Sequence, residues 1–314
     1  MIQPYVHGER RSTLYAYTYV IVINYLIALW CLCRFLIEPY VMPKLLGKKY
    51  TEADEGQKRT MTNHVVNILW KCSTLFGLYP FIMTVVLGKP SNTYLTYGNV
   101  TYGDMLALAY MLFSAGFIFE LIYRSRISFV TALHHLVALF ISTIVSWMIV
   151  ARVRGGMEGQ AELHIIFTYG VFEIFFETGP HVMMILYKRY RNRQAMLKKG
   201  FLFVALWSFT GTFLEQFAIG YLYIHNWAAW DMSLKVLTPI LHCCFAAAQV
   251  HGGRVFLALS RKMAREYAES LKNKDDLYVL EPQVSFQTVA TDVVEKKSSG
   301  VRVSVVEEIQ EIQK

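Results

Sequence analysis

The chain has 314 residues, of which 54% are hydrophobic, 15% are aromatic and only 17% are charged, and its net charge is +8. This composition argues against a water-soluble domain and favours a protein whose solvent is the lipid bilayer. The positive charge indicates anionic lipid headgroups as partners rather than nucleic acid. All five cysteines lie within apolar stretches, so no disulfide framework is expected.

Seven apolar stretches follow one another along the chain, separated by charged or Gly- and Pro-containing breaks. A transmembrane helix needs about 20 predominantly apolar residues. The stretches therefore predict an all-α fold, a polytopic membrane bundle of about seven transmembrane helices. Their approximate bounds are 14–37, 65–87, 104–123, 129–150, 163–187, 201–224 and 236–257. Arg34 and Glu38 stand where a signal cleavage site would need small residues, so the first helix is expected to be retained.

The Lys and Arg residues between the spans predict the orientation, because positively charged loops stay on the cytosolic side. Most of them lie in the first, third and fifth loops and directly after the last span. The C-terminus is therefore expected to be cytosolic and the N-terminus lumenal or extracellular. The sequon at Asn99 then falls on the side where glycosylation occurs.

These features divide the chain into four segments. Residues 1–13 form a lumenal N-terminus, and 14–60 form the first transmembrane helix and a cytosolic loop. Residues 61–258 form a six-helix membrane domain. Residues 259–314 form a basic juxtamembrane segment, which either lies on the membrane or is solvated, and a tail from Asp275 onward. The tail has no sustained apolar period, so it is expected to be disordered.

Ionisable side chains inside a bilayer cost several kcal/mol and mark candidate functional positions. The fourth span contains the adjacent histidines His134 and His135. Neighbours on a helix point about 100° apart, so both cannot face one ligand squarely. One histidine acts and the other orients it, or each hydrogen-bonds a neighbouring helix and merely holds the bundle together.

The fifth span places Glu173, Glu177 and His181 four residues apart, on one helical face and beside Pro180. Two carboxylates one turn apart do not both ionise easily, so one is expected to be protonated or paired with an imidazolium. Proton transfer and a structural clamp between helices both remain open. The last two spans add Glu215 and His242.

Other ionisable residues lie near the ends of the expected spans, among them His64, Lys71, Asp104 and Glu120. Side chains at such positions can extend to the membrane surface, which explains them without a functional role. Glu120 can also pair with Arg124, four residues further along the same helix.

Several of these features together resemble the TLC-domain family, which includes the ceramide synthases. They are the carboxylate Glu120, the basic loop Arg124-Ser125-Arg126 and the paired histidines in Thr131-Ala132-Leu133-His134-His135-Leu136. The resemblance covers roughly residues 60–260, and the segment from Glu173 to His181 is similar to the family's non-synthase branch. It implies a helical bundle around a long cavity, residence in the endoplasmic reticulum, and acyl transfer from acyl-CoA to a sphingoid amine with the paired histidines central.

The chain departs from the ceramide synthases because it has neither their His-Asp pair nor the Ser-Asp pair that follows it. Three hypotheses remain. The first is a TLC-type protein that modifies or binds membrane lipids, with His134 or His135 as general base or nucleophile and Glu173, Glu177 or His181 tuning it. The second is a seven-span receptor without catalysis. The third, an intramembrane metalloenzyme, is disfavoured because close His spacings such as His-x-x-His-His are absent, so no metal or cofactor is expected.

Overall fold

The computed structural model describes residues 14, 17–95, 100–125, 127–154, 160–230 and 232–280. About 89% of these residues are helical and none lies in a strand, so the described part of the chain is all-α, as predicted. The expected N-terminal segment 1–13, the sequon at Asn99 and the tail from residue 281 lie outside the described residues.

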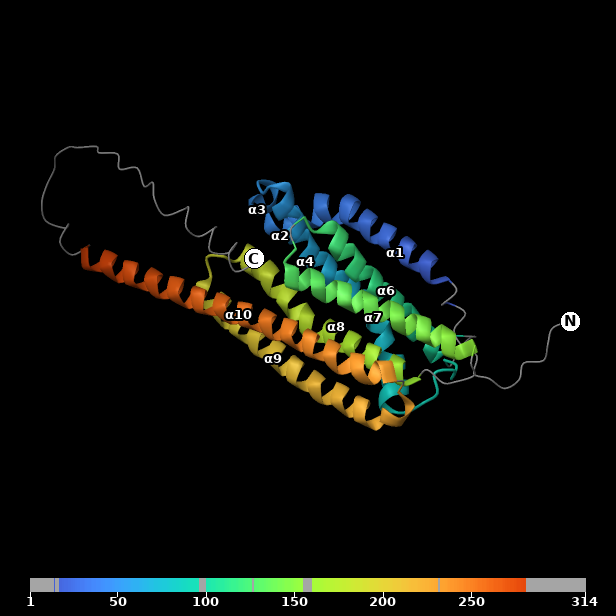
Figure 1. Cartoon of the computed structure of the whole chain (residues 1–314). Coiled ribbons are helices and arrows are strands. Elements are labelled where there is room, and N and C mark those ends of the chain that lie inside the picture. Colours follow the sequence, from blue (N-terminus) through green and yellow to red (C-terminus); the bar gives the residue numbers. More distant parts are fainter. Residues whose placement is uncertain are drawn as a thin grey trace, which may run out of the picture.

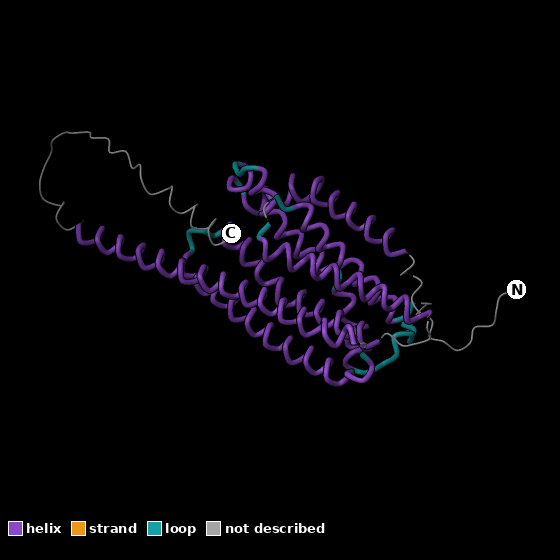
Figure 2. The backbone as a smooth tube through the Cα atoms, viewed as in Figure 1, coloured by secondary structure: helices purple, strands orange, loops and turns teal. Residues whose placement is uncertain are grey.

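The long helices run side by side as a bundle (Figures 1 and 2). They are α1 (Thr18–Leu32), α4 (Glu55–Ser73), α6 (Tyr102–Tyr123), α7 (Phe129–Arg154), α8 (Gln160–Arg189), α9 (Gln194–His225) and α10 (Met232–Leu280). The shorter helices are α2 (Met42–Leu46), α3 (Lys48–Thr51) and α5 (Leu78–Phe81), with π-helical stretches at Cys33–Val41 and Ile82–Val86 and 3-10 turns at Leu75–Gly77 and Trp227–Ala229.

Each expected span falls on a helix, and four helical stretches are long and apolar enough to cross a membrane. These are Thr18–Leu46, Glu55–Val86, Tyr102–Tyr123 and Gln194–His225, while Phe129–Ile144 is a shorter apolar helix. The other long helices contain more polar residues, such as Glu173 and His181 in α8, which lower their mean hydropathy. The described residues thus support a helical membrane protein, and the count of seven spans stays a prediction.

Side chains at the helix ends explain where two of the helices begin. The Asp54 carboxylate accepts a hydrogen bond from the Gln57 backbone N–H at 2.8 Å and caps α4, which therefore begins ten residues before the expected span. Thr101 and Asp104 form a reciprocal capping box at the start of α6. Asp104 thus has a structural role at the start of α6.

A glycine allows the closest contact between α4 and α6. The Trp70 ring lies against Gly116, and a Cβ atom added there would meet the Trp70 ring at 2.5 Å. Trp70 is fully buried and packs edge-on against Phe113 and Phe117, with ring centroids 5.3 and 5.8 Å apart. This contact anchors the α4 face that carries the polar residues described below.

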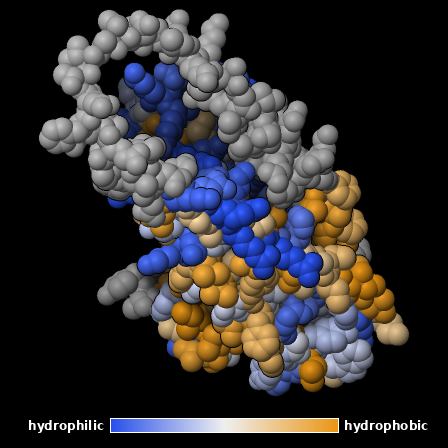
Figure 3. Space-filling view, turned by 90° about the vertical axis from the view of Figure 1, so that its left-hand side faces the viewer, coloured by the Kyte–Doolittle hydropathy of each residue, from blue (hydrophilic) through white to orange (hydrophobic). Residues whose placement is uncertain are grey.

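Three basic loops share one end of the bundle. The Lys49 ammonium donates to the backbone carbonyls of Lys188 and Arg189 at 3.1 and 3.3 Å, and the Ser125 hydroxyl donates to the Gly56 carbonyl at 3.4 Å. Figure 3 shows hydrophilic residues gathered at this end. The first, third and fifth loops therefore lie on one side, as the predicted topology requires, and which compartment that side faces stays a prediction.

The basic juxtamembrane segment continues the last span as one helix, α10, which projects beyond the bundle in Figure 1. Met263 is fully buried, and Arg191 in the α8–α9 loop donates to both carboxylate oxygens of Glu266 at 2.7 and 2.8 Å. This pairing raises the pKa of the Arg191 guanidinium. The start of the segment is therefore held against the protein, and α10 continues through Leu280, past the expected start of the tail at Asp275.

Candidate functional site

One face of α4 brings polar side chains into the bundle interior. Asn63, Asn67 and Lys71 follow one another at four-residue spacing and are 0%, 2% and 1% exposed. The expectation that Lys71 reaches the membrane surface was wrong, because its side chain is buried and pairs with Glu173 of α8. The amide–amide–ammonium spacing was the sequence signal that could have revealed this buried face.

Lys71 pairs with Glu173 of α8 inside the bundle. Its Nζ atom lies 3.0 Å from Glu173 Oε1 and 3.4 Å from the Glu173 backbone carbonyl oxygen. The other carboxylate oxygen, Oε2, lies 3.6 Å from His134 Nε2 of α7. Glu173 therefore lies between a lysine of α4 and a histidine of α7. The sequence suggested an imidazolium as the partner of a carboxylate on this helix. In the structure Glu173 also has the Lys71 ammonium as a partner, which the sequence did not suggest.

His135 faces a different carboxylate, as the helical geometry predicted. Its Nε2 atom lies 3.2 Å from Glu120 Oε2 of α6, and its ring stacks on Phe117 at a centroid distance of 4.5 Å. Glu120 Oε1 accepts hydrogen bonds from Asn63 at 3.0 Å and Arg124 at 2.9 Å, so the predicted Glu120–Arg124 pair is confirmed. Glu120 is only 3% exposed, which excludes the surface position considered for it.

The other predicted site residues make their contacts elsewhere in the bundle, away from the Glu173 and Glu120 pairs. His181 Nδ1 of α8 lies 3.0 Å from His64 Nδ1 of α4, with the partly buried Glu177 one turn before it. The predicted site residues thus do not converge on one point, and His181 is linked to a histidine that the sequence analysis had assigned to a span end.

Helices α9 and α10 contribute two further polar contacts. The Gln249 amide donates to Glu215 Oε2 at 2.7 Å, and Glu215 is 2% exposed. The Tyr169 hydroxyl and His242 Nδ1 lie 2.8 Å apart, joining α8 to α10. Tyr169 is thus the partner of His242, and Gln249 is the partner of Glu215.

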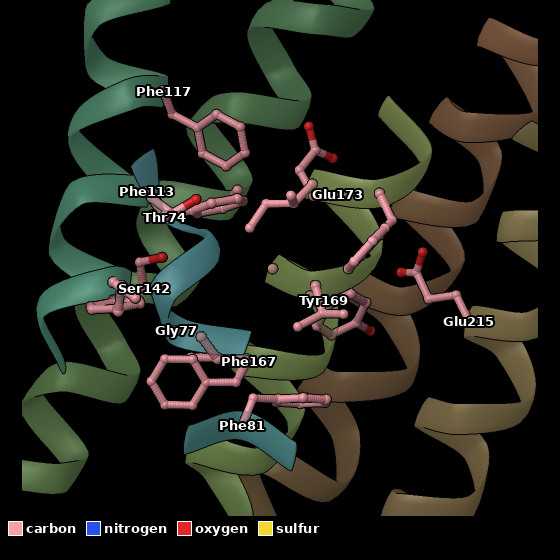
Figure 4. A pocket seen from close by; sticks show the side chains of 18 of the residues that line it. Thr74, Gly77, Phe81, Phe113, Phe117, Ser142, Phe167, Tyr169, Glu173 and Glu215 are labelled. Carbon is pink, nitrogen blue, oxygen red and sulfur yellow. The ribbon is translucent and has the colours of Figure 1, made fainter. Parts of the chain in front are cut away.

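An aromatic cavity of about 100 Å³ lies between these helices. Its walls are mostly apolar and contain several aromatic rings, and its polar lining includes His134, Glu173, Glu215 and Gln249 together with the hydroxyls of Thr74 and Ser142. In Figure 4, Glu173 lies well away from Phe81 and Phe167, so its carboxylate and these rings line different parts of the cavity. Of the paired histidines, only His134 lines it.

The volume indicates what the cavity can hold. One ordered water needs roughly 10–15 Å³ by this kind of measure, so 100 Å³ admits several water-sized groups. Apolar walls with a few convergent polar groups are typical of small-molecule sites. The cavity is therefore suited to a mostly apolar ligand that carries a polar group.

Among the described residues, no group of three or more His, Cys, Asp or Glu side chains is arranged to hold a metal ion. The polar residues of the cavity form pairs between helices instead. The sequence matches no protein-family model, no curated protein and no solved structure.

Proposed function

We propose that this protein is a TLC-type membrane protein of about seven spans, which binds an acyl lipid in the aromatic cavity and presents its polar end to His134. The supporting observation is that the ring-lined cavity has His134 and Glu173 in its wall. Aromatic side chains bury large apolar areas, which favours a hydrocarbon chain, while the His134–Glu173 pair fixes the position of a polar group.

His134 acts as the general base in this proposal. Glu173 orients its Nε2 atom across 3.6 Å, and Lys71 holds Glu173 in turn. Within the described part of the chain His134 Nδ1 is buried and makes no hydrogen bond, so this second nitrogen is left without a partner when Nε2 faces Glu173. A base with an orienting carboxylate is the usual arrangement for activating a nucleophile, and such contacts often tighten when substrate binds.

The reaction proposed is acyl transfer, with acyl-CoA as donor. His134 removes the proton from the amine or hydroxyl of a lipid acceptor as that atom attacks the thioester carbonyl carbon. The carbon–sulfur bond then breaks, and the imidazolium returns the proton to the departing thiolate. His135 is a positioning residue, because it contacts Glu120 and does not line the cavity. If no acyl transfer takes place, the same cavity still supports lipid binding and control of membrane composition.

Lipidomics of cells that lack the protein tests the proposal. The cells are rescued at matched expression by wild type, His134→Ala or the control His251→Ala, which changes an exposed histidine of α10. We expect one lipid class to change on loss of the protein, and wild type and the control to restore it while His134→Ala does not. Equal rescue by His134→Ala would make the histidine structural. An unchanged lipid profile would refute lipid handling and favour the receptor hypothesis.

The location proposed is the endoplasmic reticulum membrane, with the C-terminus cytosolic. The gathering of three basic loops at the end from which α10 projects supports this orientation. Protease protection of tags at the two termini of the full chain, in sealed microsomes, tests it. Cleavage of the C-terminal tag alone is expected, and cleavage of both tags would contradict an odd number of spans.

A further inference from the structure

A second hollow, separate from the aromatic cavity, lies on the bundle between α1, α4 and α6. Its volume is about 610 Å³, and it shares no lining residue with the aromatic cavity. We call it the outer groove. Its apolar wall includes Ile27, Trp30 and Ile122, and its charged rim consists of Arg34, Glu38, Glu55 and Arg59.

The apolar wall of the outer groove is open to the surroundings. Ile122 is 73% exposed, Ile27 55% and Trp30 52%. Helices α1 and α6 both belong to stretches that are long and apolar enough to cross a membrane, and apolar side chains exposed on such stretches are suited to contact with lipid acyl chains. Trp30 lies one turn before Arg34, an order typical of the boundary between acyl chains and headgroups. The groove thus runs from the apolar region to the membrane surface.

Within the described residues, one cation of the charged rim, Arg59, has no carboxylate partner, because both rim glutamates are paired with other side chains. Both carboxylate oxygens of Glu38 have a partner. Arg34 Nη1 lies 2.9 Å from Oε2, and the Tyr123 hydroxyl donates a hydrogen bond to Oε1. Glu55 is paired with Lys58 at 3.3 Å. Arg59 is exposed and makes no hydrogen bond or ion pair within the part of the chain that the structure describes.

Arg34 also has unused hydrogen-bonding capacity. A guanidinium carries five N–H donors, and only one terminal nitrogen of Arg34 is engaged by Glu38, while the side chain is 63% exposed. Both arginines line the groove, so an anion bound in it has two guanidiniums in the surrounding wall. The fork geometry of the guanidinium matches phosphate oxygens, which a lysine at the same place would not.

We infer that the outer groove binds one anionic phospholipid of the surrounding membrane. Its phosphate contacts Arg59 and the free N–H groups of Arg34, and one acyl chain lies along Ile27, Trp30 and Ile122. A phosphodiester carries one negative charge, which pairs with the guanidinium of Arg59. The basic loops at this end of the bundle raise the local concentration of anionic lipid. The site does not depend on the function proposed for the aromatic cavity.

Native mass spectrometry of the full chain, released from mixed micelles that contain phosphatidylglycerol and phosphatidylcholine in equal amounts, tests this inference. We expect wild type to retain one phosphatidylglycerol in preference to phosphatidylcholine. Arg59→Gln removes a side chain without a described partner, so the fold is expected to persist. Its apparent affinity for phosphatidylglycerol should fall about tenfold, the loss expected for one charged hydrogen bond.

Lys198→Gln/Lys199→Gln is the matched control, because it removes two exposed positive charges of α9 outside the groove. It should retain phosphatidylglycerol like wild type. Equal losses in the control and in Arg59→Gln would mean general attraction to a basic surface and would overturn the inference. Equal retention of phosphatidylcholine by wild type, or undiminished binding by Arg59→Gln, would overturn it as well.

Discussion

Replacing Lys71 by methionine should destabilise the protein strongly, because it leaves the Glu173 carboxylate buried without its ammonium partner. The side chains of Lys71 and Glu173 are only 2% and 10% exposed, and their charged atoms lie 3.0 Å apart. Removing one partner of a buried ion pair typically costs about 3–5 kcal/mol. Methionine is similar in length and apolar, so the change in packing is small.

Proton uptake by Glu173 limits this cost and makes it depend on pH. A glutamate with an ordinary pKa of about 4.3 is neutralised at pH 7 for about 3.7 kcal/mol, since each pH unit corresponds to about 1.36 kcal/mol. At pH 5 the same neutralisation costs only about 1 kcal/mol. The destabilisation of Lys71→Met relative to wild type should therefore be about 3–4 kcal/mol at pH 7 and shrink as the pH falls.

Unfolding by sodium dodecyl sulfate in mixed micelles, followed by tryptophan fluorescence at both pH values, measures these free energies. The double variant Lys71→Met/Glu173→Gln is the control, because it removes both charges, and it should be closer to wild type than Lys71→Met is. Equal stability of Lys71→Met and wild type at pH 7 would show that the ion pair is not buried as described. A loss that does not depend on pH would refute the part assigned to Glu173.

Other changes test the packing and the helix ends. Gly116→Ala should destabilise the protein by about 1–3 kcal/mol in the same unfolding assay, because the added Cβ would clash with the Trp70 indole. Gly220→Ala is the control: its added Cβ meets nothing within 4 Å, so it should be neutral or stabilising. Asp54→Ala should cost about 1 kcal/mol and Asp54→Asn little, since asparagine also caps; equal losses would contradict capping. Glu266→Gln weakens the ion pair with the α8–α9 loop, so limited trypsin digestion should cut the α10 extension faster than in wild type.

The features that the sequence predicted correctly depend on contacts within one helix. Apolar stretches of sufficient length fall on the observed helices, because a helix satisfies its own backbone hydrogen bonds wherever it lies. The divergence of His134 and His135 and the Glu120–Arg124 pair follow from helical periodicity alone. Local spacing determines these features before any helix meets another.

Lys71 illustrates what only the tertiary structure decided. Whether it reaches the membrane surface or the interior depends on how α4 is rotated against α8. Close packing at Gly116 selects one rotation and brings Lys71 to Glu173. The sequence by itself thus determined which residues are helical and which are polar within the bundle. Packing between helices decided which polar groups meet, and where the cavity and the outer groove lie.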